Sequence, residues 1–276
     1  MQITNAFTVD VEDYFHVSAF ERHIPRAAWE QQAQRVEAST ERVLAALDKH
    51  RAFGTFFTLG WVAERYPQLI RRIVAQGHEL ASHGYDHTRV THMSPKIFRA
   101  DITKTKRLLE DIAGSEVIGY RAPTFSFTKD NQWVYESLAE AGYRYSSSIA
   151  PVRHDLYGIP DAPRHAYQAQ AGITEVPIST VRIASHNLPC SGGGFFRLYP
   201  YRLTRWCFER LNVREGKPCI FYMHPWEIDP DQPRQRELSF KTKFRHYLNL
   251  DRVASRLDRL LEDFAWNRMD RIFLTP

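Results

Sequence analysis

Hydrophobic and polar positions divide the chain into short apolar runs and longer runs with apolar residues every three or four positions. The first pattern is typical of buried strands and the second of helices. The two kinds of run alternate almost throughout. Strands are predicted for residues 3–11, 54–59, 78–83, 117–122, 143–149, 173–178, 218–224 and 271–275. Helices are predicted for residues 34–50, 61–77, 95–113, 130–141, 200–212 and 240–265.

This alternation indicates the fold class. Strands that alternate with helices form a mainly parallel sheet with helices packed on it, and such a sheet can close into a barrel. Residues 150–171 and 179–200 fit neither pattern, and we expect them to be long functional loops. Because no internal repeat or interdomain linker is visible, we expect a single domain over residues 1–276.

Composition and charge exclude some classes of protein. With 276 residues and 43% hydrophobic residues, the chain can bury a sizeable core. The 37 basic and 32 acidic residues are spread along the chain, which argues against a nucleic-acid partner. Three cysteines without C-x-x-C spacing argue against a disulfide framework. The N-terminal stretch has carboxylates where a signal peptide is apolar, and no apolar run could span a bilayer, so we expect a cytoplasmic protein.

Polar residues gather at the predicted ends of four strands. The first strand ends in FTVDVED, and the motifs ASHGYDH, GYRAP and FYMHPWE end three others. In barrels of alternating strands and helices the active site lies at the C-terminal strand ends, so these side chains should meet at one mouth. His83 and His87, four positions apart, can both reach one ion. Burying such groups together is costly unless a metal or mutual pairing compensates, so the pattern predicts a metal or acid/base site.

The motifs TVDVED, SHGYDH, YRAP and FYMHP, in this order, resemble the successive motifs of the NodB-type polysaccharide deacetylases, the family-4 carbohydrate esterases. The resemblance extends from about residue 5 to residue 230. VDVEDYFHVSAFE, SGGGFFRLYP, HPWEIDPDQPR and FRHYLNLDR resemble the branch associated with exosortase (PEP-CTERM) loci, with a branch-specific C-terminal part at about 225–276. The resemblance implies a deformed (β/α)7 barrel with the NodB homology fold, and a divalent metal ion, most often Zn2+.

In that family one carboxylate and two histidines hold the ion, and the matching histidines are His83 and His87. The carboxylate has two candidates. An ungapped D-x-D match makes it Glu12, whereas a bulge at the strand end makes it Asp13, and the sequence leaves both open.

The resemblance also implies catalytic roles. Asp10 would take a proton from the attacking water, and His224 would give one to the departing amine. Arg121 matches the arginine that pairs with the base and favours its ionised form. The backbone N–H of Thr124 matches the position that completes the oxyanion hole. The family's D-x-x-D-W motif is absent and YSSSIAP stands in its place, so no partner for His224 is identified.

Three further residues are candidates for substrate binding. Gly193 lies in SGGGFF, whose backbone N–H groups can donate, and Tyr199 and Trp226 could stack on sugar rings. The function implied is a metal-dependent hydrolase that removes N-acetyl groups from N-acetylhexosamines of an exopolysaccharide or its lipid-linked intermediate, in peripheral association with membrane-bound exopolysaccharide machinery. Two alternatives stay open: an allantoinase-like hydrolase of a cyclic amide, and a catalytically inactive glycan-binding protein.

Overall fold

Seven parallel strands form the centre of the fold, in the order β10-β1-β2-β3-β4-β5-β7. Strand β6 pairs antiparallel with β7, and β11 pairs with the beginning of β1. The structure is a computed structural model and describes residues 2–154 and 157–274. The strands are β1 Thr4–Val11, β2 Thr55–Thr58, β3 Glu79–Ser82, β4 Gly119–Tyr120, β5 Tyr145–Ser146, β6 Tyr167–Gln168, β7 Thr174–Glu175, β8 Thr180–Ile183, β9 His186–Pro189, β10 Ile220–Met223 and β11 Ala265–Asn267.

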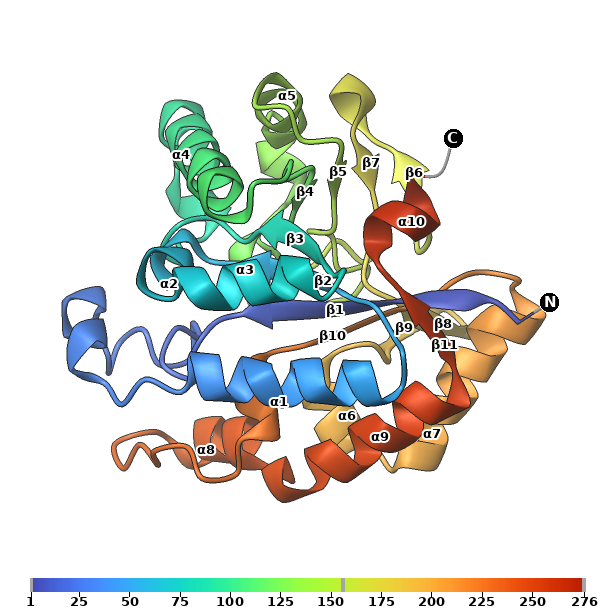
Figure 1. Cartoon of the computed structure of the whole chain (residues 1–276). Helices are drawn as coiled ribbons and strands as arrows, with labels where there is room; N and C mark the ends of the chain where they lie inside the picture. Colours follow the sequence, from blue (N-terminus) through green and yellow to red (C-terminus); the bar gives the residue numbers. More distant parts are fainter. Residues whose placement is uncertain (1, 155–156, 275–276) are drawn as a thin grey trace.

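Helices surround this curled sheet (Figure 1). Seven of the eight residues of β1 are buried, as are all four of β2, β3 and β10, which is typical of parallel strands covered on both faces. The predicted α/β class and the deformed (β/α)7 barrel are confirmed. The helices are α1 Val36–Lys49, α2 Gly60–Arg65, α3 Pro67–Ala75, α4 Pro95–Ala113, α5 Val134–Glu140, α6 Gly193–Leu198, α7 Tyr201–Glu209, α8 Phe240–Tyr247, α9 Val253–Asp263 and α10 Met269–Phe273.

Helix α4 has the bounds that its sequence pattern predicts, because both of its ends are specified locally. The Ser94 side chain accepts a hydrogen bond from the amide of Ile97, and Gly114 ends the helix in a left-handed conformation. The predicted helix over 61–77 is instead two helices, α2 and α3, since Pro67 begins a new helix.

The single helix predicted over 240–265 is wrong. Helix α8 ends before Asn249, which is left-handed with φ 51°, and α9 begins at Val253. The Arg197 side chain donates to the carbonyl oxygens of His246 and Leu248, so a tertiary contact takes up the acceptors at the end of α8.

The strand predicted over 271–275 is also wrong, and its residue 275 lies outside the described residues. The segment belongs largely to α10, while β11 forms the preceding pairing with β1. The amide of Met269 donates to Thr55 Oγ1 and that of Asp270 to Glu79, so side chains from the barrel satisfy the free N–H groups at the start of this helix.

Residues 179–200, predicted to be irregular, contain the hairpin β8–β9 and helix α6. Strand β6 lies near the end of the other predicted loop, 150–171, within which 155–156 lie outside the described residues. In the part of the chain that the structure describes, no helix combines the length and the apolar character needed to cross a bilayer.

Candidate active site

The parallel strands bring three metal-ligating side chains together at their C-terminal ends. Glu12 directly follows β1, and His83 directly follows β3. Glu12, His83 and His87 are buried, and one ligand atom of each lies within 4.8 Å of the others. Nδ1 of His83 lies 2.9 Å from the carbonyl oxygen of Arg121 and must donate to it, so Nε2 carries the lone pair. We call Glu12, His83 and His87 the metal-ligand cluster.

The chemistry of this cluster fits a divalent cation. Burial lowers the pKa of His83 to about 4 and that of His87 well below its usual value, so both rings are neutral at pH 7. Burial likewise raises the pKa of Glu12 to about 8. Although Oε2 of Glu12 lies 3.1 Å from Nε2 of His87, it accepts no hydrogen bond from the described residues. A buried, unsatisfied carboxylate oxygen beside two neutral imidazoles is a donor set typical of zinc and similar ions.

Asp13 occupies a different environment from Glu12. Its Oδ2 accepts hydrogen bonds from the amides of Arg35 (2.6 Å) and Val36 (2.8 Å), at the start of α1, and its Oδ1 accepts one from the amide of Tyr14. A carboxylate that caps a helix in this way has both oxygens engaged. The structure therefore brings Glu12, and not Asp13, together with the two histidines.

Asp10 and Arg121 form a buried ion pair. Nη1 of Arg121 lies 2.6 Å from Oδ1 of Asp10, and both side chains are at most 3% exposed. The guanidinium also donates to Thr8 Oγ1, and to the carbonyl and hydroxyl oxygens of Ser147. The YSSSIAP segment, which replaces the family's D-x-x-D-W motif, thus holds the arginine in place. Four hydrogen bonds from the guanidinium thus fix Arg121 and, through it, the position of Asp10.

His224, directly after β10, lies between two carboxylates. Its Nε2 lies 3.2 Å from Glu12 Oε1, and its Nδ1 lies 3.3 Å from Glu227 Oε2. Glu227 Oε1 accepts a hydrogen bond of 2.9 Å from Arg197 Nε. Burial alone would lower the pKa of His224, but the charges of Glu12 and Glu227 outweigh it and raise this pKa to about 9. The raised pKa favours the protonated ring, which can donate a proton.

Glu227 is the partner of His224 that the sequence did not identify. Burial alone would raise its pKa, yet the Arg197 guanidinium and His224 lower it to about 2. Glu227 and Arg197 are both at most 3% exposed, and the amide of His224 donates to Glu227 as well. A carboxylate three residues after the late-strand histidine, combined with an arginine in the glycine-rich segment, is the only sequence signal for this pair.

Two residues expected to bind substrate have other contacts. A Cβ on Gly193 would lie 1.8 Å from Glu227 Oε2, so this glycine makes room for the carboxylate. The ring of Trp226 is stacked between the imidazoles of His224 (5.2 Å) and His246 (4.2 Å) and is 5% exposed. Both faces of Trp226 are thus occupied by imidazoles, and its substrate-binding role stays a prediction.

Tyr199 and Thr124 keep the roles expected for them as predictions. The Tyr199 ring is half-buried and lies 5.6 Å from that of Phe195. Thr124 is left-handed, with φ 57°, and its hydroxyl lies 2.7 Å from the Ser18 hydroxyl. The chain therefore turns sharply just after Arg121, as a segment that presents a backbone N–H to a ligand can do.

Two hollows lie at this site; one reaches His224, and the other reaches the metal-ligand cluster at His87. One, of about 360 Å3, is lined by His224 and Trp226, together with Tyr222 and Phe244. The other, of about 240 Å3, is lined by His87 and includes Trp29.

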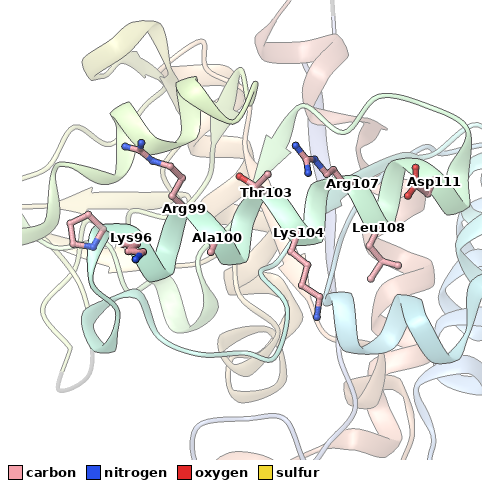
Figure 2. Close-up of a pocket in the computed structure, with 9 residues that line it drawn as sticks. Lys96, Arg99, Ala100, Thr103, Lys104, Arg107, Leu108 and Asp111 are labelled. Atoms are coloured by element: carbon pink, nitrogen blue, oxygen red, sulfur yellow. The ribbon is translucent and has the colours of Figure 1, made fainter.

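A wider hollow, on the outer face of α4, is lined by residues of that helix alone (Figure 2). The labelled charged side chains are Lys96, Arg99, Lys104, Arg107 and Asp111. Because this surface includes no member of the metal-ligand cluster or of the acid/base pairs, it is not the candidate active site.

Fold and site together define a class of protein: an α/β barrel with a carboxylate–histidine cluster and two buried ion pairs, Asp10–Arg121 and Glu227–Arg197, at the ends of its strands. Residues 29–146 match the family described as polysaccharide deacetylase, and residues 147–274 match a domain of unknown function, DUF3473. Residues 29–146 thus form a polysaccharide deacetylase region, the type found in the NodB-type family-4 carbohydrate esterases.

The similar proteins agree with this assignment. A peptidoglycan-N-acetylglucosamine deacetylase of Bacillus cereus is 35% identical over 75 residues, which are 27% of each chain. A peptidoglycan deacetylase of Helicobacter pylori is 29% identical over 113 residues, which are 41% of this chain and 38% of the relative. The alignments thus span less than half the length of these relatives.

A solved structure shows the same fold. A Mycobacterium smegmatis protein, provisionally described as a polysaccharide deacetylase, superposes with a TM-score of 0.62 at 20% identity, over 98% of this chain and 88% of the other.

Proposed function

We propose that this protein is a metal-dependent hydrolase that removes N-acetyl groups from N-acetylhexosamine residues of an exopolysaccharide or its lipid-linked intermediate. The observation that carries the proposal is the convergence of one carboxylate–histidine cluster with two candidate acid/base groups, Asp10 and His224, at one end of the barrel. The deacetylase family match and the peptidoglycan deacetylases of similar sequence support this choice of substrate class.

Glu12, His83 and His87 are proposed to hold the metal ion, with Zn2+ as the expected metal. When bound, a divalent cation at this position would polarise the amide carbonyl and lower the pKa of a water molecule. The neutral imidazoles and the unsatisfied carboxylate oxygen support this assignment.

Asp10 is proposed to accept the proton of the attacking water, and Arg121 holds this carboxylate in place. His224, whose raised pKa favours the protonated ring, then donates its Nε2 proton to the amide nitrogen as the C–N bond breaks. Glu227 accepts the hydrogen bond from Nδ1 and stabilises the imidazolium. The products are acetic acid and a free amine, which become acetate and an ammonium group in solution, and the proton taken up by Asp10 balances the one that His224 gives.

The two matched regions are proposed to form one functional domain. Strands β1 to β5 come from the first 146 residues, while β7 and β10 come from the DUF3473 region and pair with β5 and β1. His224, Glu227 and Arg197 all lie in the DUF3473 region, so this region would supply the proton donor and its partners. The metal-ligand cluster lies in the part of the chain that precedes this region. The assignment to the exosortase-associated branch, the association with membrane-bound machinery and the cytoplasmic location stay predictions.

The decisive test is acetate release from N-acetylated glucosamine oligomers by protein loaded with zinc, with His224→Ala as the negative control. Turnover that needs both the metal and His224 is the expected result. Hydrolysis of allantoin instead of the oligomers would favour the cyclic-amide alternative. Oligomer binding without acetate release, at full metal content, would identify a glycan-binding protein.

A further inference from the structure

Helix α8 presents a surface that combines exposed phenyl rings with cationic side chains. The Phe240 side chain is 84% exposed and that of Phe244 is 49% exposed. They lie one helical turn apart, with ring centroids 6.5 Å from each other and nearly parallel planes. Exposed apolar side chains that gather in one place mark interaction sites. The α8 surface consists of Leu198, Phe240 and Phe244 with Arg234, Arg236, Lys241, Lys243 and Arg245.

The charge of this surface is strongly one-sided. Residues 231–245 carry five cationic side chains against the two carboxylates of Asp231 and Glu237. Within the described residues, none of the five cations lies within 4 Å of a carboxylate; Lys243 instead donates to a backbone carbonyl, and Arg234 lies over the Tyr247 ring. The cationic face of α4 differs, because its Arg99 is paired with Glu140 at 2.7 Å. The α8 cations are therefore free to meet an external anion.

Helix α8 is also fixed to the candidate active site. The ring of His246, on the buried side of the helix, stacks on Trp226 at 4.2 Å, and Trp226 stacks in turn on His224. A hollow of about 460 Å3 lined by Phe240 shares Phe244 with the hollow beside His224. Figure 1 shows α8 on the side of the molecule toward which β1 runs, where the metal-ligand cluster lies. Anything that docks on α8 therefore lies next to the entrance of the site.

We propose that the α8 surface docks on an anionic lipid bilayer, with Phe240 and Phe244 in the boundary between headgroups and acyl chains and the cations against lipid phosphates. Protruding phenyl rings flanked by Lys and Arg are typical of helices that lie in the membrane interface. A glycan-binding ring is more enclosed and has polar partners for the sugar hydroxyls, whereas Phe240 is almost fully open to solvent. Docking does not rest on the proposed function; combined with it, docking would turn the active site toward glycans carried at the membrane.

Sedimentation with vesicles tests this inference without any turnover. The probes are vesicles of phosphatidylcholine alone and vesicles that contain about 30 mol % phosphatidylglycerol. We expect the full chain to bind the anionic vesicles about tenfold more strongly than the phosphatidylcholine vesicles. Salt at about 0.5 M should remove most of this difference. Phe240→Ser, and separately the double variant Lys241→Glu/Arg245→Glu, should each weaken binding to the anionic vesicles about five- to tenfold.

Matched controls separate docking from general charge and hydrophobicity. Val213→Ser removes a side chain that is 81% exposed, and Lys96→Glu/Arg107→Glu makes the same charge change on α4 (Figure 2). Both controls should bind like the unmodified chain, and thermal unfolding should be unchanged in all variants. No preference for anionic vesicles, or an equal loss in the α4 control, would overturn the proposal. So would α8-dependent retention by an acidic polysaccharide without vesicle binding, because the partner would then be a glycan.

Discussion

Glu227 lies with Oε2 3.3 Å from Nδ1 of His224, the ring nitrogen opposite the one that faces the metal-ligand cluster. The same oxygen accepts the backbone N–H of His224, because Pro225 begins a tight turn that brings the two residues together. The backbone hydrogen bond holds the carboxylate in place, and the contact with Nδ1 fixes the direction of the ring. In this chain the carboxylate that contacts Nδ1 of His224 follows the histidine by three residues, within the DUF3473 region.

We predict that His83→Ala and His87→Ala each lower the metal content of the purified protein by at least about tenfold, because each removes one of three protein ligands. Elemental analysis measures this directly. His92→Ala, at an exposed position outside the cluster, is the matched control and should keep its metal. Equal metal content in all three variants would place the site elsewhere.

Glu12→Ala and Asp13→Ala should have opposite effects. Glu12→Ala should abolish metal binding, whereas Asp13→Ala should keep the metal and lower the free energy of unfolding by about 1–2 kcal/mol, since it removes the carboxylate that caps α1. Metal analysis with chemical denaturation compares the two variants. Metal loss in Asp13→Ala at normal stability would show that the assignment of the carboxylate is wrong.

Asp10→Asn and His224→Ala are expected to keep the metal and the fold while each lowers kcat for acetate release by about 10²–10⁴-fold. The double variant should be far less impaired than the product of the two losses, because both groups serve one reaction. Steady-state rates on a short N-acetylated oligosaccharide measure all four proteins. Near-normal turnover in either single variant would exclude that residue from the mechanism.

Gly193→Ala should act through Glu227. The new Cβ would lie 1.8 Å from Oε2, so the carboxylate must move away from His224, and we expect kcat to fall about tenfold or more while KM changes little. Gly194→Ala is the matched control, because its Cβ would meet no atom within 4 Å. Glu227→Gln should reproduce the loss in kcat. If Gly193→Ala lowers only the unfolding temperature, or if both glycine variants behave alike, Gly193 does not position Glu227.

The ion pair of Glu227 predicts a pH dependence of stability. Its pKa is about 2 in the folded protein, against 4.5 for an ordinary glutamate. Between these values the unfolded chain binds more protons, so a stabilisation of up to about 3 kcal/mol, complete above pH 4.5, is lost as the pH falls toward 2.

Denaturation of wild type and Glu227→Gln at several pH values measures this loss. The variant should lack this part of the pH dependence. Glu140→Gln, which breaks the exposed pair with Arg99, should keep it. An identical pH dependence in wild type and Glu227→Gln would contradict the ion pair.

Much of the barrel could be predicted from the sequence, because its information is local. Apolar runs specify the central strands, and Ser94 and Gly114 specify both ends of α4. The residues that could supply ligands and acid/base groups also follow from the motifs, since polar residues at the ends of parallel strands must meet at one edge. Local patterns failed where a distant partner decides the conformation: Arg197 takes the carbonyls that end α8, and Thr55 and Glu79 bond the first amides of α10.

The sequence alone thus determined the fold class, the four motifs at the strand ends and a short set of candidate residues. Only the tertiary structure distinguished the environment of Glu12 from that of Asp13. Asp13 accepts hydrogen bonds from backbone amides at the start of α1, the first of them 22 residues further along the chain, whereas Glu12 lies beside the two histidines. The tertiary structure alone also joined Arg197 to Glu227 and placed Gly193 against that carboxylate. Spacing in a sequence shows which groups a segment offers, whereas the burial and the partner of a charge depend on segments brought together by folding.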